Sequence, residues 1–434
     1  MMRAGVVKKL ALHWQISIAL ALGVVLGLGL DAESSLGGWV VEACRFIGDL
    51  FLRALKMLIV PLIAASIISG VASLGDTRSL GRLGAKTAVY YLSTSLIAVL
   101  VGLSVVSWLQ PGIVAGKPAG GGLGLPSDAG AVRDRVGDRD LSDLLNVIRS
   151  MVPENVVADA ASGAMLGVIT FSLLFGAYSA RLPEPELGTM LGFWRGVNQV
   201  MMLITGFVMR FAPIGVFGLV TPMVAEAGLG ALGALGAYVA CVLLALGFHA
   251  AVVLPAILRF IGRLSPARHL RAMAPALLMA FSTASSSATL PLTLARVRES
   301  AGVSNRVSSF TLPLGATINM DGTALYECVA ALFIAQAYGL ELGPATQLTV
   351  VLIALLSSVG VAGIPSASLV AITLILTTVG LPAEAAGLIL AVDRPLDMCR
   401  TAVNVWSDTC CAVIVARSEG ERDILEPSGP EVSP

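Results

Sequence analysis

The chain has 434 residues, of which 56% are hydrophobic and 13% are charged, and its mean hydropathy is +0.86. Soluble domains carry about 25% charged residues, so this composition excludes both an ordinary soluble enzyme and a disordered chain. The 28 basic and 28 acidic residues cancel, which gives no indication of a nucleic-acid partner. The composition therefore predicts an integral membrane protein.

The first 30 residues place basic side chains before an apolar run, as a signal peptide does. No small-x-small cleavage pattern precedes Asp31, so we expect a retained first helix. The six cysteines lie in or beside apolar runs and the three histidines are scattered. This spacing predicts packing residues rather than a disulfide framework or a metal centre, and no cofactor is expected.

Apolar segments recur along the whole chain, and two of them are split by polar residues. A spanning helix needs about 20 apolar residues, whereas arms of about 10–14 are typical of re-entrant hairpins. The segment 272–295 is interrupted at 282–287, and 347–379 is interrupted at 357–365. The uninterrupted segments lie near 10–30, 46–72, 87–109, 155–180, 191–222, 230–258, 305–337 and 385–416. We therefore expect an all-α integral membrane protein with eight transmembrane helices and two re-entrant hairpins.

Basic residues set the expected orientation. The connections 31–43, 223–232, 338–346 and 380–386 contain no Lys or Arg, so they are predicted to lie outside, with both termini in the cytoplasm. The two hairpins then enter from opposite sides of the plasma (inner) membrane. Each hairpin is followed by a polar helix, and such inverted repeats are typical of transporters that bind substrate near the midplane.

Two segments concentrate the polar and ionisable side chains, which are functional candidates at membrane depth because burying them is costly. At about 100° per residue, positions 393, 397, 400, 404 and 408 share one helical face. The first segment contains Asn319, Asp321 and Glu327; the second contains Asp393, Arg394, Asp397, Arg400, Asn404 and Asp408. The alternative reading of this face is an internal salt-bridge ladder.

The helix face matches an amino dicarboxylate. Arg400 can bind a carboxylate with two parallel hydrogen bonds, and Asp397, one turn away, can hold an ammonium group. Arg394 is the nearest further guanidinium, but it lies about 100° from Asp393 around the helix. The pattern predicts a pocket for a zwitterion with an extra carboxylate.

The stretch 319–323 interrupts an apolar helix at Gly322. Such a break frees backbone carbonyls, and together with Asn319, Asp321 and Asp408 it would offer oxygen ligands to a small cation. The alternative is a kinked helix with capping side chains. The serines at 285–287 equally suit a binding tip or hydrogen bonds between helices.

Glu327 is a lone carboxyl group in the same apolar helix, six residues beyond Asp321. Its ionised form is costly there, so it can bind and release a proton during a transport cycle. The alternative is a glutamate held by a nearby arginine or facing a water-filled cavity.

The segments ASSSATLPLT, TLPLGATINMDGTALYE, VAGIPSAS and DMCRTAVNVWSD resemble signatures of the dicarboxylate/amino acid:cation symporters. This family of glutamate/aspartate transporters includes the excitatory amino acid transporters, and the match runs from about residue 44 to 417. The resemblance implies sodium-coupled symport of L-glutamate or L-aspartate by an elevator mechanism, with sodium ions as coupling ions. It also implies proton coupling through Glu327, because family members with a glutamate at this position resemble the proton-coupled transporters.

The resemblance implies roles for individual residues. Arg400 with Thr323 would bind the substrate side-chain carboxylate, and Asp397 with Thr401 the amino group. The substrate shell would be completed by Asn404, Ser286 and the backbone of Ile364. One sodium site would use Asp408, Asn404, Asn319 and the Gly315 carbonyl; a second would use backbone at Thr317, Ser358, Val359 and Val361, near Met320; a third would use Asp321, Asn319, Tyr91, Thr94 and Ser95.

The resemblance further implies a homotrimer in the lipid bilayer with a static and a moving part. Residues 1–85 and 110–225 would form the scaffold and trimer contacts. Residues 86–109 and 226–417 would form the transport domain, with hairpins at 266–299 and 347–379, and 418–434 would be a cytoplasmic tail.

One departure and several alternatives accompany the resemblance. Family members usually carry a further arginine at one of two positions, which here are Ala284 and Met398.

The alternative function is that of a C4-dicarboxylate symporter or a neutral amino acid symporter of the same fold. A C4-dicarboxylate would leave Asp397 unpaired, and a neutral amino acid would leave Arg400 unpaired. No intramembrane protease pattern occurs in the sequence, and a passive channel would not explain the matched amine and carboxylate site.

Overall fold

The computed structural model describes residues 12–30, 34–72, 81–123, 125, 149, 151–162, 165–227, 229–360, 368–422 and 424–425. These residues are almost entirely helical, which confirms the expected all-α class. The longer helices are α1 (Leu12–Gly29), α2 (Ser35–Ala72), α3 (Gly81–Leu109), α7 (Met165–Ser179), α8 (Glu186–Met209), α9 (Ala212–Ala227), α10 (Leu229–Phe248), α12 (Pro266–Thr283), α13 (Ser286–Glu299), α14 (Asn305–Ile318), α15 (Asp321–Ala337), α16 (Pro344–Gly360), α17 (Ser368–Thr378) and α18 (Gly387–Ser418).

Short elements connect or extend these helices. They are the strand pair β1 (Ile113–Val114) and β2 (Lys117–Pro118), the 3₁₀ turns η1 (Ala119–Leu123) and η3 (Ala383–Ala386), the π-helical turn η2 (His249–Val253), and the helices α6 (Val156–Ser162) and α11 (Leu254–Phe260). The two strands pair in antiparallel fashion directly after α3.

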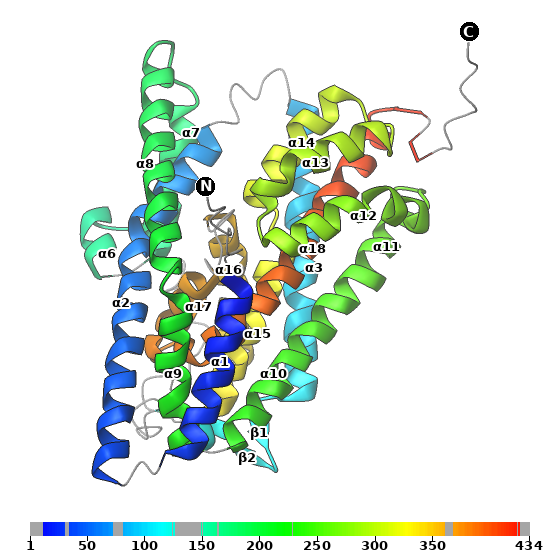
Figure 1. The fold of residues 1–434 in the computed structure, drawn as a ribbon. Coiled ribbons are helices and arrows are strands. Elements are labelled where there is room, and N and C mark those ends of the chain that lie inside the picture. The colour runs from blue at the N-terminus through cyan, green and yellow to red at the C-terminus, as the bar shows by residue number, and fades with distance from the viewer. Residues whose placement is uncertain are drawn as a thin grey trace, which may run out of the picture.

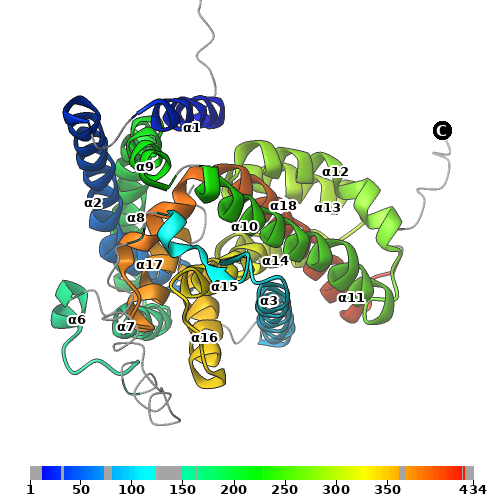
Figure 2. The ribbon, with the colours of Figure 1, turned by 90° about the horizontal axis from the view of Figure 1, so that it is seen from below.

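The helices form two groups, visible on the left and right of Figure 1. In one group α2 packs against α7, α8 and α9, and α1 packs against α9. In the other group α18 packs against α12, α13 and α14. Helix α15 lies between the groups in the end-on view of Figure 2, where it packs against α3, α10, α16, α17 and α18.

Three helical stretches in the described part of the chain are long and apolar enough to cross a membrane: Arg82–Leu109, Gly233–Phe260 and Asn305–Ala337. The pair Glu186–Met209 and Ala212–Ala225, bent by 51°, would form a fourth. Large apolar side chains such as Trp39, Trp108 and Phe260 are exposed, as expected for a surface that faces lipid rather than water. These features are those of a multi-pass membrane protein.

The stretch Asn305–Ala337 differs from the others because 94% of its most apolar window is buried inside the protein. It is broken at Asn319 and Met320: the Asn319 amide still bonds to the Gly315 carbonyl, and a new helix begins with the bond from the Ala324 amide to the Met320 carbonyl. The predicted break is therefore confirmed, but its cause is not a glycine. Gly322 already lies inside the first turn of α15.

The two split segments each form a pair of contacting helices. Helices α12 and α13 meet at Ala284, which adopts a left-handed conformation with φ of 49°, and at Ser285, whose side chain accepts a bond from the Ala288 amide. Helices α16 and α17 also contact one another, and their connection 361–367 lies outside the described residues. Their re-entry into a bilayer remains a prediction.

The segment after α18 is tied to the helix ends beside it. Glu419 accepts hydrogen bonds from Arg82 (3.0 and 3.1 Å) and from Lys86 (2.7 Å) at the start of α3. These bonds lower the pKa of Glu419 from its ordinary value of 4.5 to about 2, and the hydrogen bond from Arg82 contributes most. Ile424 and Leu425 are buried against the protein, so the first part of the expected tail is packed.

Candidate functional site

The polar face of α18 is buried against α14 and α15. Its five predicted members are each 4% exposed or less, although three of them are carboxylates and one is an arginine. They are Asp393, Asp397, Arg400, Asn404 and Asp408. Burial of so many ionisable groups is unfavourable unless they pair with one another or with a ligand, so their partners define the site.

Arg400 is held by two carboxylates and an aromatic ring. Its Nε and Nη2 donate to Asp397 Oδ1 at 3.0 and 2.9 Å, and its Nη1 donates to Asp393 Oδ1 at 3.1 Å. The Tyr326 ring lies 4.4 Å from the guanidinium carbon, and its hydroxyl donates to Asp393 Oδ1 at 3.0 Å. The salt-bridge ladder thus exists, and it fixes the orientation of the guanidinium that was predicted to bind substrate.

Arg394 joins the same cluster through Asp397 rather than Asp393. Its Nη1 donates to Asp397 Oδ2 at 3.2 Å, from one turn before Asp397 along α18. Both oxygens of Asp397 are therefore engaged by guanidinium groups. Arg394 was expected to lie away from Asp393, and its pair with Asp397 was not predicted.

Asn404 connects α18 to the first turn of α15. Its Nδ2 donates to Thr323 Oγ1 at 3.1 Å, and its Oδ1 accepts from the Gly322 amide at 2.8 Å. Thr323 is thereby brought to the face that carries Arg400. Ser286 at the start of α13 and Thr401 on α18 are also buried, whereas Ile364 lies outside the described residues.

Asp408 and Asn319 meet beside a glycine. Asn319 Nδ2 donates to Asp408 Oδ1 at 2.9 Å, while Asn319 Oδ1 has no hydrogen-bond partner among the described residues. A Cβ at Gly315 would collide with Asp408 Oδ1, so only glycine allows the carboxylate to approach this backbone. The result is a buried group of oxygen atoms with one unpaired acceptor.

Asp321 gathers partners from three other elements. Thr94 and Ser95 of α3 donate to its Oδ1 at 3.3 and 2.6 Å, and Ser407 of α18 donates to its Oδ2 at 2.7 Å. His249, in the π-helical turn η2, places Nε2 3.1 Å from the same Oδ2. Tyr91 is turned away, since its hydroxyl donates to the Thr311 carbonyl at 2.8 Å.

The second predicted cation set is only partly described. The hydroxyls of Thr317 and Ser358 donate to carbonyls of their own helices, and Met320 Sδ lies 3.2 Å from Asn404 Nδ2. Val359 belongs to α16, but its side chain and all of Val361 lie outside the described residues.

Glu327 is fully buried on α15, within two turns of Asp321. Ser357 of α16 donates to its Oε2 at 2.8 Å, and its Oε1 has no partner among the described residues. No arginine among the described residues forms an ion pair with Glu327. The alternative in which an arginine holds this glutamate is therefore not observed there. One carboxyl oxygen is thus available to carry a proton.

Comparison with known proteins identifies the family of the chain. The family model of the sodium:dicarboxylate symporter family matches residues 12–418. The chain belongs to this family. It is a symporter and not an enzyme. It is 36% identical to the proton/glutamate-aspartate symporter of Escherichia coli, over 96% of this chain and 94% of that protein.

Two further relatives carry names that state different substrates. The proton/sodium-glutamate symport protein of Bacillus caldotenax is 34% identical, over 95% of this chain and 96% of that protein. The neutral amino acid transporter B(0) of Bos taurus is 37% identical, over 90% of this chain and 77% of that protein. Family membership therefore shows the transport class, and the substrate must be argued from the site.

In this symporter several residues beside the site were not predicted from the sequence. Tyr326, Ser357 and Ser407 lie within or next to the segments that were singled out, but their partners are on other helices. His249 carried one usable signal, because it is an ionisable side chain in a long apolar segment.

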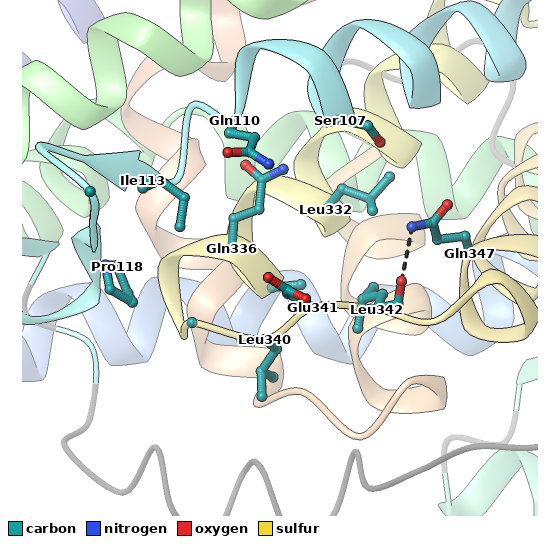
Figure 3. A pocket seen from close by; sticks show the side chains of 13 residues that line it. Ser107, Gln110, Ile113, Pro118, Leu332, Gln336, Leu340, Glu341, Leu342 and Gln347 are labelled. Atoms are coloured by element: carbon teal, nitrogen blue, oxygen red, sulfur yellow. Dashed lines mark hydrogen bonds between the residues drawn. The ribbon is translucent and has the colours of Figure 1, made fainter.

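A separate cavity of about 720 Å³ lies where α3, the strand pair, α15 and α16 meet. Figure 3 shows Gln347 on one side and Ile113 and Pro118 of the strand pair on the other. The Gln336 side chain contacts the end of α3 and the residue just before the strand pair. Its Oε1 accepts a hydrogen bond from the Gly112 backbone amide, and its Nε2 donates one to the Val106 carbonyl, each at 3.1 Å. This cavity contains none of the predicted site residues.

Proposed function

We propose that this family member carries L-glutamate or L-aspartate across the plasma membrane together with sodium ions and a proton. The observation that carries the proposal is the buried face of α18. It presents a guanidinium and a carboxylate, Arg400 and Asp397, next to the hydroxyl-bearing Thr323. An amino dicarboxylate is the small molecule whose charges complement both groups.

In the proposed substrate complex Arg400 turns part of its guanidinium from the aspartates to the side-chain carboxylate of the substrate, with Thr323 as a second donor. Asp397 and Thr401 take the ammonium group. Asn404, Ser286 and the backbone at Ile364 complete the shell. The exchange keeps every buried charge paired, which is what a low-dielectric site requires.

Sodium is cargo in this proposal, and the oxygen groups around Asp408 and Asp321 would hold it. The unpaired Asn319 Oδ1 and the close approach of Asp408 to Gly315 support the first site, with Asn404 nearby. The second site uses backbone at Thr317, Ser358, Val359 and Val361, near Met320. Thr94 and Ser95 support the third site at Asp321, with Tyr91 one turn away. Carboxylate, hydroxyl and carbonyl oxygens are ligands that small hard cations prefer.

The proposed mechanism is an elevator movement within a homotrimer, with eight spans, two re-entrant hairpins and cytoplasmic termini. The packing of α2 on α7, α8 and α9 suits a static scaffold at 1–85 and 110–225. The packing of α3 on α15 and of α12 and α13 on α18 suits a moving unit at 86–109 and 226–417. Coupling requires that sodium bind the occupied site more tightly than the empty one.

The rival substrates are a neutral amino acid and a C4-dicarboxylate without an amine. Arg400 disfavours the first, because a neutral side chain would offer its guanidinium no carboxylate. A C4-dicarboxylate would not supply the ammonium group that Asp397 is proposed to bind, although Arg394 pairs with the same carboxylate.

Uptake into proteoliposomes tests the proposal. Radiolabelled glutamate and aspartate are supplied outside, with and without an inward sodium gradient, and unlabelled serine and succinate are added as competitors. The proposal expects sodium-dependent accumulation of one or both acidic amino acids and weak competition by serine. Sodium-independent equilibration, or accumulation of serine in place of both acids, would refute it.

A further inference from the structure

Asp397 is paired twice before any substrate arrives. Arg400 occupies its Oδ1 from one turn after it on α18, and Arg394 occupies its Oδ2 from one turn before it. Arg394 is 9% exposed and Asp397 4% exposed, so neither group relies on water for its counter-charge. The carboxylate predicted to receive an ammonium group therefore already has an internal cation in the place of that ammonium.

The charges of the cluster balance without substrate. Asp393 and Asp397 supply two negative charges, and Arg394 and Arg400 supply two positive charges, all within 3.2 Å contacts. Removing one guanidinium would leave a buried carboxylate without its counter-charge, which is among the most unfavourable changes in a protein interior. Because Arg394 contacts Asp397, this carboxylate keeps one counter-charge if Arg400 turns toward a substrate carboxylate.

With Arg394 on Oδ2 and Arg400 on Oδ1, an ammonium group would be a third cation at Asp397, and the two guanidinium groups would repel it unless one of them moved away. Arg394 can move away from Asp397 when an ammonium group binds there, because its side chain is long and flexible. Its Nε has no hydrogen-bond partner among the described residues that would hold it in place. A substrate without an amine would not displace it, and Asp397 would stay neutralised.

We propose that Arg394 is a specificity-determining residue that supplies the counter-charge of Asp397 whenever the bound dicarboxylate has no ammonium group. This inference rests on the proposed function, because it assigns Asp397 to the amine. The inference also removes the argument that Asp397 excludes a dicarboxylate without an amine. Such a ligand leaves the pair between Arg394 and Asp397 intact.

The first experiment uses the unmodified protein and compares inhibition constants of succinate and L-aspartate against labelled aspartate at saturating sodium. If Asp397 stays paired, succinate should bind within about 100-fold of aspartate. Leaving the carboxylate unpaired would cost about 100-fold or more. A succinate constant more than about 100-fold weaker than that of aspartate would overturn the proposal without any variant having to fold.

The second experiment compares Arg394→Met, Arg394→Lys and, as a matched control with the same loss of charge on the surface, Arg268→Met. Arg394→Met should weaken succinate at least about tenfold relative to aspartate, because only aspartate brings its own cation. Arg394→Lys and Arg268→Met should keep the ratio within about threefold of the parent value. An equal loss of both ligands in Arg394→Met would mean a merely structural ion pair and would overturn the proposal.

The two proposals fail in different ways. If the parent protein takes up neither glutamate nor aspartate with sodium, the proposed function is wrong, and labelled succinate then reports on Arg394 directly. Sodium-driven succinate uptake that is unchanged in Arg394→Met would reject the role of Arg394 as well. If acidic amino acid uptake is intact and the succinate ratio does not respond to Arg394→Met, only the inference about Arg394 is wrong.

Discussion

Gly322 touches the backbone of Arg400, and a Cβ on Gly322 would lie 2.6 Å from the Arg400 carbonyl oxygen and 3.0 Å from its Cα. Helix α15 can therefore approach α18 only because residue 322 has no side chain. The contact places Thr323 and Asn404 within hydrogen-bonding distance of one another. The glycine that was predicted to break the helix instead sets the distance between the two helices that build the site.

Gly322→Ala should weaken acidic amino acid binding, because α15 must move away from Arg400 to make room. Overpacking of this kind costs about 1–3 kcal/mol. The thermal midpoint and the aspartate affinity of the purified protein measure the effect. Gly343→Ala is the matched control, since nothing lies within 4 Å of a Cβ at that position. Equal behaviour of the two variants would contradict the packing argument.

Arg400→Cys should abolish uptake of glutamate and aspartate, because Asp393 and Asp397 lose their shared partner and the substrate carboxylate loses its counter-charge. The loss is about 3–5 kcal/mol. Neutral amino acids such as serine should then be accepted in preference. Uptake of labelled glutamate, aspartate and serine by the same proteoliposomes decides between these outcomes, and unchanged acidic uptake would remove Arg400 from the site.

Asp321→Asn and Asp408→Asn should lower sodium affinity first, because each removes a charge from a buried oxygen cluster that is proposed to hold a cation. Asp397→Asn should instead weaken amino acid binding and leave sodium binding without substrate largely intact. Sodium titrations in the absence and presence of aspartate separate the two effects. The same sodium dependence in all three variants and the parent would contradict this division of roles.

Glu327→Gln should make net uptake insensitive to external pH between about 5.5 and 8, because the amide cannot bind and release a proton. Exchange of internal for external aspartate should persist, since neither direction of exchange then needs a change of protonation. Acidification of the proteoliposome lumen during sodium-driven uptake gives a direct readout. A parent protein that neither acidifies the lumen nor responds to pH would refute the role of Glu327.

Glu419 should stabilise the folded protein over most of the pH range, because Arg82 and Lys86 hold its folded pKa at about 2, below the ordinary value of 4.5. The stabilisation is fully present above pH 4.5 and is lost as the pH falls from there toward 2. Glu419→Gln should accordingly lower the thermal midpoint at pH 7 and converge with the parent at the acidic end. Glu299→Gln, at an exposed position on α13, is the control and should show no such pH-dependent difference.

The amino-acid sequence by itself determined the class of protein and the residues that matter. Low charge and long apolar runs exclude a soluble fold, because water cannot solvate that much apolar surface. The spacing of Asp397, Arg400 and Asn404 places them on one helical face whatever surrounds the helix, since helical geometry is local. The break at Asn319 was likewise visible as polar residues in an apolar run.

Only the tertiary structure decided what these residues touch. The partners of Asp321 lie 72 to 227 positions away along the chain, on α3, η2 and α18, and no periodicity connects such distant segments. Arg394 and Asp397 are i,i+3 neighbours on α18, so local helix geometry permits their pair, and the tertiary structure decides that both side chains are buried. Local geometry fixes faces, and long-range packing in a low-dielectric interior fixes which charges must meet.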